Sequence, residues 1–575
     1  MNRFCIKVTG ESGAGLLSTG EILTKAFHDM GYYVCADREY PSLIKGGHSC
    51  FVINVSDEPV YSLDEDPDVI LAIDRQSLEA YWQDLKNGGT LIYGYERPIG
   101  LKEIVGKLKK RGCESVHLMS REIAEEFGGN YLMVNVVLVG MLWKHLGLDW
   151  KHVKKSIEKK FASKPRLLAI DLKCAKAGYD RVESVVKFPK AKKKSKTLLI
   201  DGNKSLALGA VHAGCRAYYA YPMSPASTIL THMSNFASET GVLVKQGEDE
   251  ITVSNMTLGS MYMGTRALCA TSGGGFDLMT ETMSLAGITE TPLVAIIVQR
   301  PGPGTGLPTW TGQADLNMSI YSSHGEFAKL VIGCGDSADC FELIQHAFNF
   351  AEKYQVVVIV LSEKVIAESL MTVPVFKQGN IKIERGLVEG AELKKLENED
   401  RYRITKDGVS KRWIPGSSKA YYFANGDEHL EDGSLTEDAK PSHEMIAKRM
   451  RKVETLKKAL PDPEVYGAQS GADISFVGWG SSKNVMRDAI AYYKDKGVKV
   501  NYLHYSYVYP LREKAAQRFF KANKNVHLLE GNNQGQFGDL LEAKAKVELG
   551  GRLLKWNGRP FFIDDVTKYI DKKLK

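Results

Sequence analysis

Short apolar strands that run directly into glycine-rich turns constrain the fold of this 575-residue chain more than any other feature. Near the start, Phe4–Val8 leads into the turn Thr9–Gly15, and a helical pattern of apolar residues follows. Later strands of the same kind are Tyr33–Ala36, Val69–Ile73, Gly89–Tyr93, Arg216–Tyr221, Ala267–Thr271, Leu293–Val298 and Val356–Leu361. Strands that alternate with helices predict an α/β fold built on parallel, doubly wound sheets.

Changes of composition divide the chain into five predicted stretches. Residues 1–185 and 198–377 form two α/β units, and residues 471–575 form a third with strands at Ile474–Val477, Val498–Leu503 and Val526–Leu529. Residues 186–197 carry six lysines and little to bury, which indicates a solvated basic linker, with binding of RNA or anionic lipid as the alternative. Residues 378–470 are polar and turn-rich, with one helix near His443–Leu460.

Composition excludes several classes of protein and of site. Hydrophobic residues make up 43% and charged residues 25%, which excludes a disordered or coiled-coil protein. The net charge of +7 comes from 76 basic against 69 acidic residues and does not favour nucleic acid as a partner. None of the nine cysteines forms a C-x-x-C pair, so no metal is expected on this chain. Scattered thiols, a strand where a signal peptide would lie, and no apolar run of membrane-spanning length predict a cytoplasmic protein.

The first glycine-rich turn has two interpretations. Gly10, Gly13 and Gly15 follow a strand and open a helix, where backbone amides can hold a phosphate. The order of the glycines is not G-x-G-x-x-G, and no Lys-Ser/Thr follows as in a Walker A motif. A purely structural tight turn is therefore the alternative.

Four turns of the second α/β unit carry more chemistry. They are Tyr221–Ser227, Gln246–Glu250, Thr271–Gly275 and Gln299–Leu316, and ligands of open parallel sheets bind at such strand ends. Hydroxyls and acids in these turns also suit ordinary helix starts. Arg300 at the end of a buried strand is harder to explain by a structural role. Its forked guanidinium group suits the binding of a carboxylate or phosphate. The residues alone thus predict an anion bound over a sheet edge with a carboxylate nearby.

These turns resemble the α subunit of the 2-oxoacid:ferredoxin oxidoreductases with the family's γ domain fused in front. The matching motifs are YPMSPAS at 221–227, EDEI at 248–251, TSGGG at 271–275, QRPGPGTGLPT at 299–309, DGVSKRWIPG at 407–416, NGDEHLEDGSLTED at 425–438 and KRMRK at 448–452. GESGAG at 10–15 and KGGH at 45–48 resemble the γ domain. Ser224 and Gly304 replace a Thr and a Ser of the family, and Glu11-Ser12 interrupts the first glycine motif.

The resemblance implies a cofactor and a set of partners. It implies the thiamine-diphosphate pyrimidine-domain fold, followed by a domain like the C-terminal domain of transketolase. No Gly-Asp-Gly is present, so the diphosphate, Mg²⁺ and a [4Fe–4S] cluster are expected on a β subunit. The implied assembly is an (αβ)₂ heterotetramer that oxidises a 2-oxoacid with coenzyme A and passes electrons to ferredoxin, or fixes carbon dioxide in reverse. No nucleic acid or membrane partner is implied.

The resemblance also assigns roles to residues. Glu248 is the implied catalytic carboxylate toward the cofactor's aminopyrimidine ring, in competition with Asp249 and Glu250. Since residues 248 and 250 point about 200° apart on a helix, only one of the two can face the cofactor. The other implied cofactor-binding residues are Tyr221, Pro222, Ser272 and Gly273. The implied binding residues for the substrate carboxylate are Ser224, Arg300 and Thr309.

Three alternatives stay open from the sequence. We expect 2-oxoglutarate as the substrate because the fused form with a long polar insert resembles chains of that type, and pyruvate is the alternative. A non-catalytic scaffold subunit would keep the fold without the site, but Glu248, Arg300 and Thr309 are all present. A homodimeric enzyme of transketolase type would need a complete diphosphate motif in this chain.

Overall fold

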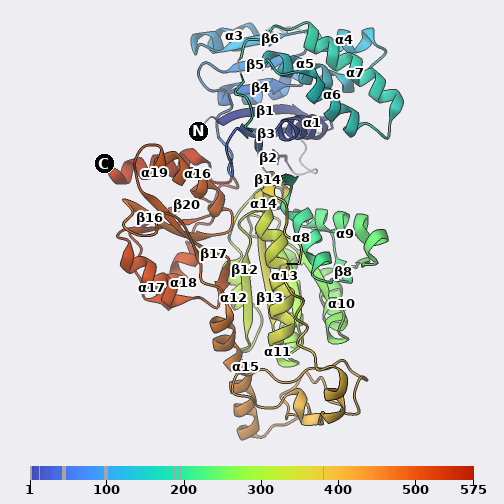
Figure 1. Ribbon diagram of the computed structural model, residues 1–575, viewed down its shortest axis with the longest axis vertical. Helices are drawn as coiled ribbons and strands as arrows, with labels where there is room; N and C mark the ends of the chain where they lie inside the picture. The colour runs from blue at the N-terminus through green and yellow to red at the C-terminus, as the bar shows by residue number, and fades with distance from the viewer. Residues whose placement is uncertain are drawn as a thin grey trace. The chain divides into compact units, whose positions relative to one another are not determined.

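The computed structural model describes residues 3–11, 13–41, 47–95, 101–186, 188–192, 196–379 and 381–575. The chain forms two compact units. The first comprises Met1–Ile200, Glu368–Val375 and Phe561–Tyr569, and the second comprises Asp201–Ala367, Phe376–Pro560 and Ile570–Lys575. Sheets of eight, seven and five strands, alternating with helices, confirm the predicted α/β class (Figure 1).

The sheet of the first unit is mixed, whereas the sequence predicts a parallel one. Its order is β6 (Glu114–His117), β5 (Thr90–Tyr93), β4 (Val69–Ala72), β1 (Arg3–Glu11), β3 (His48–Ser56), β2 (Tyr33–Glu39), β14 (Leu370–Pro374) and β7 (Thr197–Ile200). The pairs from β6 to β1 are parallel, and those from β1 to β7 are antiparallel. Residues 40–47 between β2 and β3 are too few for a parallel crossover, so these strands form a hairpin.

Within residues 3–200, the described part of the chain forms seven α-helices. They are α1 (Leu16–Asp29), α2 (Arg75–Tyr81), α3 (Leu101–Lys110), α4 (Ser120–Glu126), α5 (Val134–His145), α6 (Trp150–Lys160) and α7 (Pro165–Asp180). Helix α5 is buried on almost every side and packs closely on α7. A Cβ atom at Gly140 would lie 1.9 Å from the carbonyl oxygen of Ala175, so the close approach of the two helices requires glycine there.

The segment predicted as a solvated linker is anchored where the structure describes it. The ring of Phe188 packs edge-on against Phe4 at a centroid distance of 5.1 Å and also contacts Phe27 and Tyr32. Lys192 forms ion pairs with two acids, and 197–200 is strand β7. Phe188 thus anchors this stretch, whereas Lys190 and Lys192 are exposed, and the linker stays a prediction. Lys187 and residues 193–195 lie outside the described residues.

The larger sheet of the second unit is parallel apart from one edge strand. Its order is β18 (Tyr507–Tyr509), β12 (Lys329–Gly333), β13 (Val357–Glu363), β11 (Leu293–Gln299), β10 (Ala267–Thr271), β8 (Ala217–Ala220) and β9 (Leu243–Gln246). Two apolar clusters, one on each face, bury it under α8 (Gly202–His212), α9 (Ser227–Thr240), α10 (Glu250–Tyr262), α11 (Gly273–Ile288), α12 (Leu316–Tyr321), α13 (Ser337–Tyr354) and α14 (Lys364–Glu368). Strand β18 comes from the C-terminal part of the chain and pairs antiparallel with β12.

The five-stranded sheet lies in the C-terminal part. Its order is β15 (Glu464–Gly467), β17 (Val500–Tyr505), β16 (Ile474–Trp479), β19 (Val526–Glu530) and β20 (Gly551–Leu554), with helices α16 (Ser482–Lys494), α17 (Glu513–Ala522), α18 (Gln536–Ala545) and α19 (Ile563–Leu574). Over the part of the chain that the structure describes, no helix is long and apolar enough to cross a membrane.

Buried charges and a small cluster of aromatic rings hold the polar stretch 378–470. It contains the short helices η3 (Gly390–Lys395) and η4 (Asn398–Arg401) and the long helix α15 (Ala439–Ala459). On α15, Lys448 and Lys452 both pair with the buried Glu290 at the end of α11. Similar pairing joins buried Glu352 of α13 to Arg412. Ion pairs of this kind explain how a stretch poor in apolar residues is fixed to a folded domain.

Candidate active site

Four motifs predicted from the sequence follow strands of one sheet. Strands β11, β10, β8 and β9 are adjacent and parallel, so their carboxyl ends lie at one edge. The residues that follow them are Arg300, Ser272, Tyr221 and Gly247. In open α/β sheets, ligands bind at the edge formed by the carboxyl ends of the parallel strands. The fold therefore brings the motifs together.

Arg300 and Ser224, two residues predicted for one anion site, are in contact. The guanidinium of Arg300 donates a hydrogen bond of 2.6 Å to the backbone carbonyl of Ser224. Partial burial lowers the pKa of Arg300, and the nearby carboxylate of Asp315 opposes that shift. Thr309 is buried at the end of the exposed stretch 302–307, on the loop that Arg300 begins. Tyr221 and Pro222 are exposed at the end of β8.

The three neighbouring acids differ in their environments. Glu248 is exposed in the turn between β9 and α10. Asp249 caps α10, because its carboxylate accepts a hydrogen bond of 2.7 Å from the amide of Thr252, which lowers the pKa of Asp249. Glu250 is the first residue of α10 and only 3% exposed. Within this chain, the buried carboxylate is thus that of Glu250, two residues after Glu248.

Glu250 points at the first turn of α11. A Cβ atom at Gly275 would lie 2.5 Å from Oε1 of Glu250 and 2.1 Å from Oγ1 of Thr271, so only glycine permits this approach. Oε1 of Glu250 and the hydroxyl of Ser272 are both buried and have no hydrogen-bond partner in the described chain. Buried polar atoms are normally paired, and unpaired ones at one place indicate a missing ligand.

Asp315 is a second acid at the same turn, which sequence reasoning missed. A Cβ atom at Gly273 would lie 2.9 Å from both carboxylate oxygens of Asp315, and Oδ2 is buried without a partner. Burial, with a smaller contribution from Asp277, raises the pKa of Asp315 to about 7 against the opposing effect of Arg300. Asp315 lies in the predicted stretch Gln299–Leu316, but nothing in the spacing of that stretch singles it out.

The loop from Arg300 to Asp315 is held at its far end by the five-stranded sheet. Gln313 donates from Nε2 to the carboxylate of Glu363 at 2.9 Å and to the carbonyl of Trp479 at 3.1 Å. Its Oε1 accepts a hydrogen bond of 2.6 Å from the amide of Gly531. Gly306 lies in the middle of the loop with a φ of +53°, and a Cβ atom there would lie 1.9 Å from the carbonyl oxygen of Pro301.

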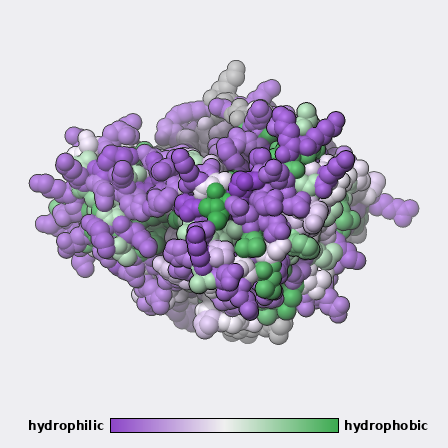
Figure 2. All heavy atoms as spheres, turned by 90° about the horizontal axis from the view of Figure 1, so that it is seen from below, coloured by the Kyte–Doolittle hydropathy of each residue, from purple (hydrophilic) through white to green (hydrophobic). Residues whose placement is uncertain are grey.

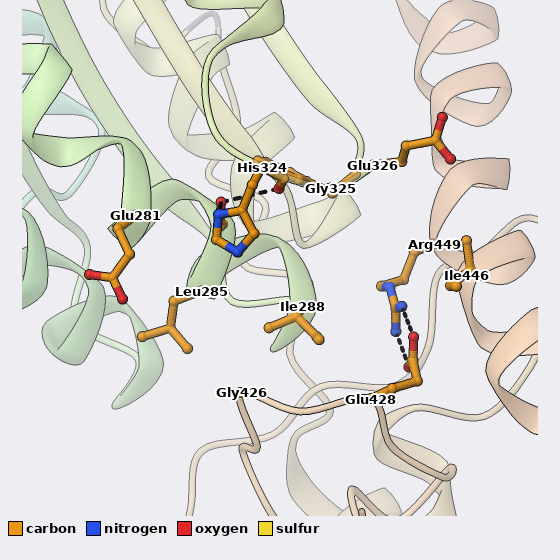
Figure 3. Close-up of a pocket in the computed structure, with 12 residues that line it drawn as sticks. Glu281, Leu285, Ile288, His324, Gly325, Glu326, Gly426, Glu428, Ile446 and Arg449 are labelled. Atoms are coloured by element: carbon orange, nitrogen blue, oxygen red, sulfur yellow. Dashed lines mark hydrogen bonds and ion pairs between the residues drawn. The ribbon is translucent and has the colours of Figure 1, made fainter. Parts of the chain in front are cut away.

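Two other cavities show no comparable set of unpaired groups. One of about 480 Å³ lies between α11, the loop 324–327 and α15. In it Glu428 pairs with Arg449, and Nδ1 of His324 lies 3.2 Å from the hydroxyl of Ser284, so these polar groups satisfy one another (Figure 3). The other, of about 810 Å³, lies in the first unit beside the glycine-rich turn.

The cavity of the first unit is lined by both signs of charge, with four acids (Glu11, Asp74, Glu122 and Glu125) and two arginines (Arg75 and Arg121). The acids do not favour a phosphate, and the predicted phosphate turn stays a prediction. Ser12, Lys45 and Gly46 of the γ-like motifs lie outside the described residues. Among the residues described, no three His, Cys, Asp or Glu side chains are placed to hold a metal ion.

Comparison with known proteins relates this geometry to a family. Residues 208–449 match the family described as "Pyruvate flavodoxin/ferredoxin oxidoreductase, thiamine diP-bdg", and residues 5–181 match "Pyruvate ferredoxin/flavodoxin oxidoreductase". The chain is 31% identical to the 2-oxoacid:ferredoxin oxidoreductase subunit alpha of Sulfolobus sp, over 99% of this chain and 96% of that protein. It is 28% identical to the 2-oxoglutarate oxidoreductase subunit KorA of Mycobacterium tuberculosis, over 98% of this chain and 90% of that subunit.

One solved structure matches the whole chain. It is the 2-oxoglutarate:ferredoxin oxidoreductase from Magnetococcus marinus with 2-oxoglutarate, coenzyme A and succinyl-CoA bound. The TM-score is 0.91 and the sequence identity is 28%, with all of both chains covered.

Proposed function

The chain belongs to the 2-oxoacid:ferredoxin oxidoreductases, as an alpha subunit with a fused γ-type domain, and from this premise we propose that 2-oxoglutarate is its substrate. In the proposed reaction, 2-oxoglutarate, coenzyme A and two oxidised ferredoxins give succinyl-CoA, carbon dioxide, a proton and two reduced ferredoxins. The reverse direction fixes carbon dioxide. The observation that carries the proposal is the full-length match to a structure holding 2-oxoglutarate and coenzyme A.

Pyruvate is the alternative substrate. Both matching family descriptions name pyruvate, and Arg300, Ser224 and Thr309 face only the carboxylate that all 2-oxoacids share. After its bond to Ser224, the guanidinium of Arg300 has further N–H donors for that carboxylate. These three residues are therefore proposed to bind the substrate without selecting its side chain.

The residues at the first turn of α11 fit the pyrimidine half of thiamine diphosphate. When bound, this cofactor supplies the electron sink for decarboxylation. A buried carboxylate with an unpaired oxygen suits a ring nitrogen that must share a proton, and Glu250 has both properties. Glu250 is therefore proposed for the role that the sequence predicts for Glu248. Ser272 and Gly273 are proposed to line the same pocket, with Tyr221 and Pro222 at its rim.

Exposed apolar residues around this site support a β subunit as its cover. Each of the four motifs or the helix after it presents one such residue: Tyr221, Ile251, Leu278 and Leu307 are 39–50% exposed. The face of the molecule shown in Figure 2 is mainly hydrophilic, with hydrophobic side chains in small groups. Apolar residues gathered at one site favour an interface. The proposed β subunit brings the diphosphate site, Mg²⁺, the [4Fe–4S] cluster and the ferredoxin contact within an (αβ)₂ heterotetramer.

The proposed location is the cytoplasm. All nine cysteines are buried and unpaired by disulfides, which suits a reducing compartment.

The proposal is tested by producing the chain together with its β subunit. Reduction of a viologen dye should depend on coenzyme A and thiamine diphosphate, and kcat/KM should be higher for 2-oxoglutarate than for pyruvate. Arg300→Ala should lower kcat/KM for both acids, by an amount that corresponds to a loss of about 2–4 kcal/mol in transition-state stabilisation, since it removes the charged partner of the shared carboxylate. Higher kcat/KM with pyruvate would assign the alternative substrate. A stable complex that turns over neither acid would indicate that the chain is a non-catalytic scaffold subunit.

A further inference from the structure

The carboxyl group of the half-buried Asp315 has a buried oxygen, Oδ2, that serves no visible structural purpose. Asp315 occupies the N-cap position of α12, yet its side chain makes no capping hydrogen bond. Its backbone is fixed instead by other groups: its amide donates to Oε1 of Gln299 at 3.1 Å, and its carbonyl accepts from the hydroxyl of Ser319 at 2.7 Å. The side chain is thus held in place against α11 while Oδ2 stays unpaired.

The charged groups around Asp315 come from three elements. Helix α11 contributes Asp277, and the loop after β11 contributes Arg300. The N-terminus of α10 contributes Glu250, which lies against Gly275 and therefore on the opposite side of the first turn of α11 from Asp315 at Gly273. The C-terminal part contributes uncharged amides. Asn532 donates to the carbonyl of Gln313 at 2.8 Å, and Gln536 donates to that of Ala314 at 2.9 Å.

The hydroxyl of Ser272 and the carboxylate of Glu250 are also unpaired at this helix start, and both residues are at least 97% buried. A ligand is therefore indicated here by groups other than Asp315 itself. Because Arg300 acts on Asp315 electrostatically, an anion bound by Arg300 lies within the field of the Asp315 carboxyl.

We propose that Asp315 is a substrate-binding acid that, in its protonated form, donates a hydrogen bond to the carboxylate held by Arg300 and so couples 2-oxoacid binding to the uptake of one proton. This inference rests on the proposed function, because it takes the site at Arg300 to be the 2-oxoacid site. The proton comes from solvent and stays on Asp315 while the acid is bound.

The sign of the coupling follows from the charges. An ionised Asp315 repels a bound carboxylate, whereas the protonated acid donates to it. Binding of the anion also neutralises Arg300, which removes the group that favours ionisation, so the pKa of Asp315 rises above its value of about 7 in the free protein. Affinity is therefore full below about pH 7 and falls as the pH rises through that value.

The test measures binding of 2-hydroxyglutarate and lactate to the complex with the β subunit. Both keep the 2-carboxylate but lack the keto group, so they bind without turnover. Titration calorimetry in buffers of different ionisation enthalpy gives the dissociation constant and the protons taken up. For wild type we expect about one proton taken up above neutral pH and binding about five- to tenfold weaker at pH 8 than at pH 6.

Two matched variants isolate the residue. Asp315→Asn keeps the size and a donor group, so its affinity should be independent of pH over the same range. Glu281→Gln changes an exposed acid on α11 that does not act on Asp315, and it should keep the wild-type slope. The proton uptake of wild type needs no variant and tests the inference even if Asp315→Asn does not fold.

The outcomes separate the inference from the proposed function. Turnover of 2-oxoacids with no proton uptake, or with equal slopes in wild type and Asp315→Asn, overturns the inference alone. If the wild type binds with proton uptake, Asp315→Asn binds without it, and the complex turns over no 2-oxoacid, the inference is supported and the proposed function is overturned. Absence of hydroxyacid binding at every pH overturns the role of Asp315.

Discussion

Glu248 and Glu250 are two positions apart, and burial separates their chemistry. Replacing Glu250 with Gln keeps the size and the hydrogen bonding but removes the group that holds a proton. We expect Glu250→Gln to slow proton exchange at the thiazolium carbon of the bound cofactor by about 10²–10⁴-fold, the usual contribution of positioned acid–base catalysis. Hydrogen–deuterium exchange in the assembled complex measures this step.

Glu248→Gln is the matched control, because Glu248 is exposed in this chain. It should leave the exchange rate nearly unchanged, and both variants should melt at the wild-type temperature. Slow exchange in Glu248→Gln with normal exchange in Glu250→Gln would restore the assignment predicted from the sequence.

The residue scale also shows what the sequence could not decide. That Arg300 and Ser224 lie at one edge of a sheet could be predicted, because both residues follow parallel strands. The choice between two glutamates depended on the helix start, and the cap at Asp249 places Glu250 as its first residue. Asp is a favoured N-cap, so this signal was available. Asp315 was not predictable, because its place against Gly273 depends on the course of a whole loop.

At the scale of elements, helix α15 depends on one buried carboxylate. Burial alone would raise the pKa of Glu290. The ammonium groups of Lys448 and Lys452 outweigh the effect of burial and hold the pKa of Glu290 well below its usual range. Glu290→Gln would leave these two lysines buried without their counter-charge. We expect a loss of about 3–5 kcal/mol in the free energy of unfolding, as measured by urea titration.

Because the pKa of Glu290 is lower in the folded than in the unfolded state, its stabilisation is present above the ordinary Glu range and is lost toward strong acid. Glu454→Gln on the same helix is the control, since Glu454 is exposed and its loss should cost less than about 1 kcal/mol. Equal costs for the two variants would show that the buried pair does not hold α15.

Element types were easier to predict than strand partners. Strand β10 has the predicted bounds, and the predicted parallel core of the second unit is present. Strand β14 lies in sequence next to the second unit but pairs with β2 and β7 of the first. Local patterns show that a strand forms, whereas its partners depend on contacts between residues hundreds of positions apart.

At the scale of the whole molecule, we propose that the chain supplies half of a cofactor site. Its nine cysteines are buried and free, so we expect the purified chain alone to be colourless, and with half a site to bind thiamine diphosphate weakly. Iron analysis and calorimetry with and without the β subunit measure both properties. Iron, or a visible absorption band, that stays with this chain after the β subunit is removed would contradict the expected division of cofactors.

The hydrogen bonds that fix the side chain of Gln313 have a consequence for proteolysis. One flank of the exposed stretch 302–307 is strand β11, and the other is tied to Glu363, Trp479 and Gly531. A protease that cuts within this stretch therefore frees no fragment: the two pieces stay associated and migrate as one native particle. The cut severs only the covalent link between Arg300 and Thr309, so a nicked protein would keep its melting temperature and lose its affinity for the substrate.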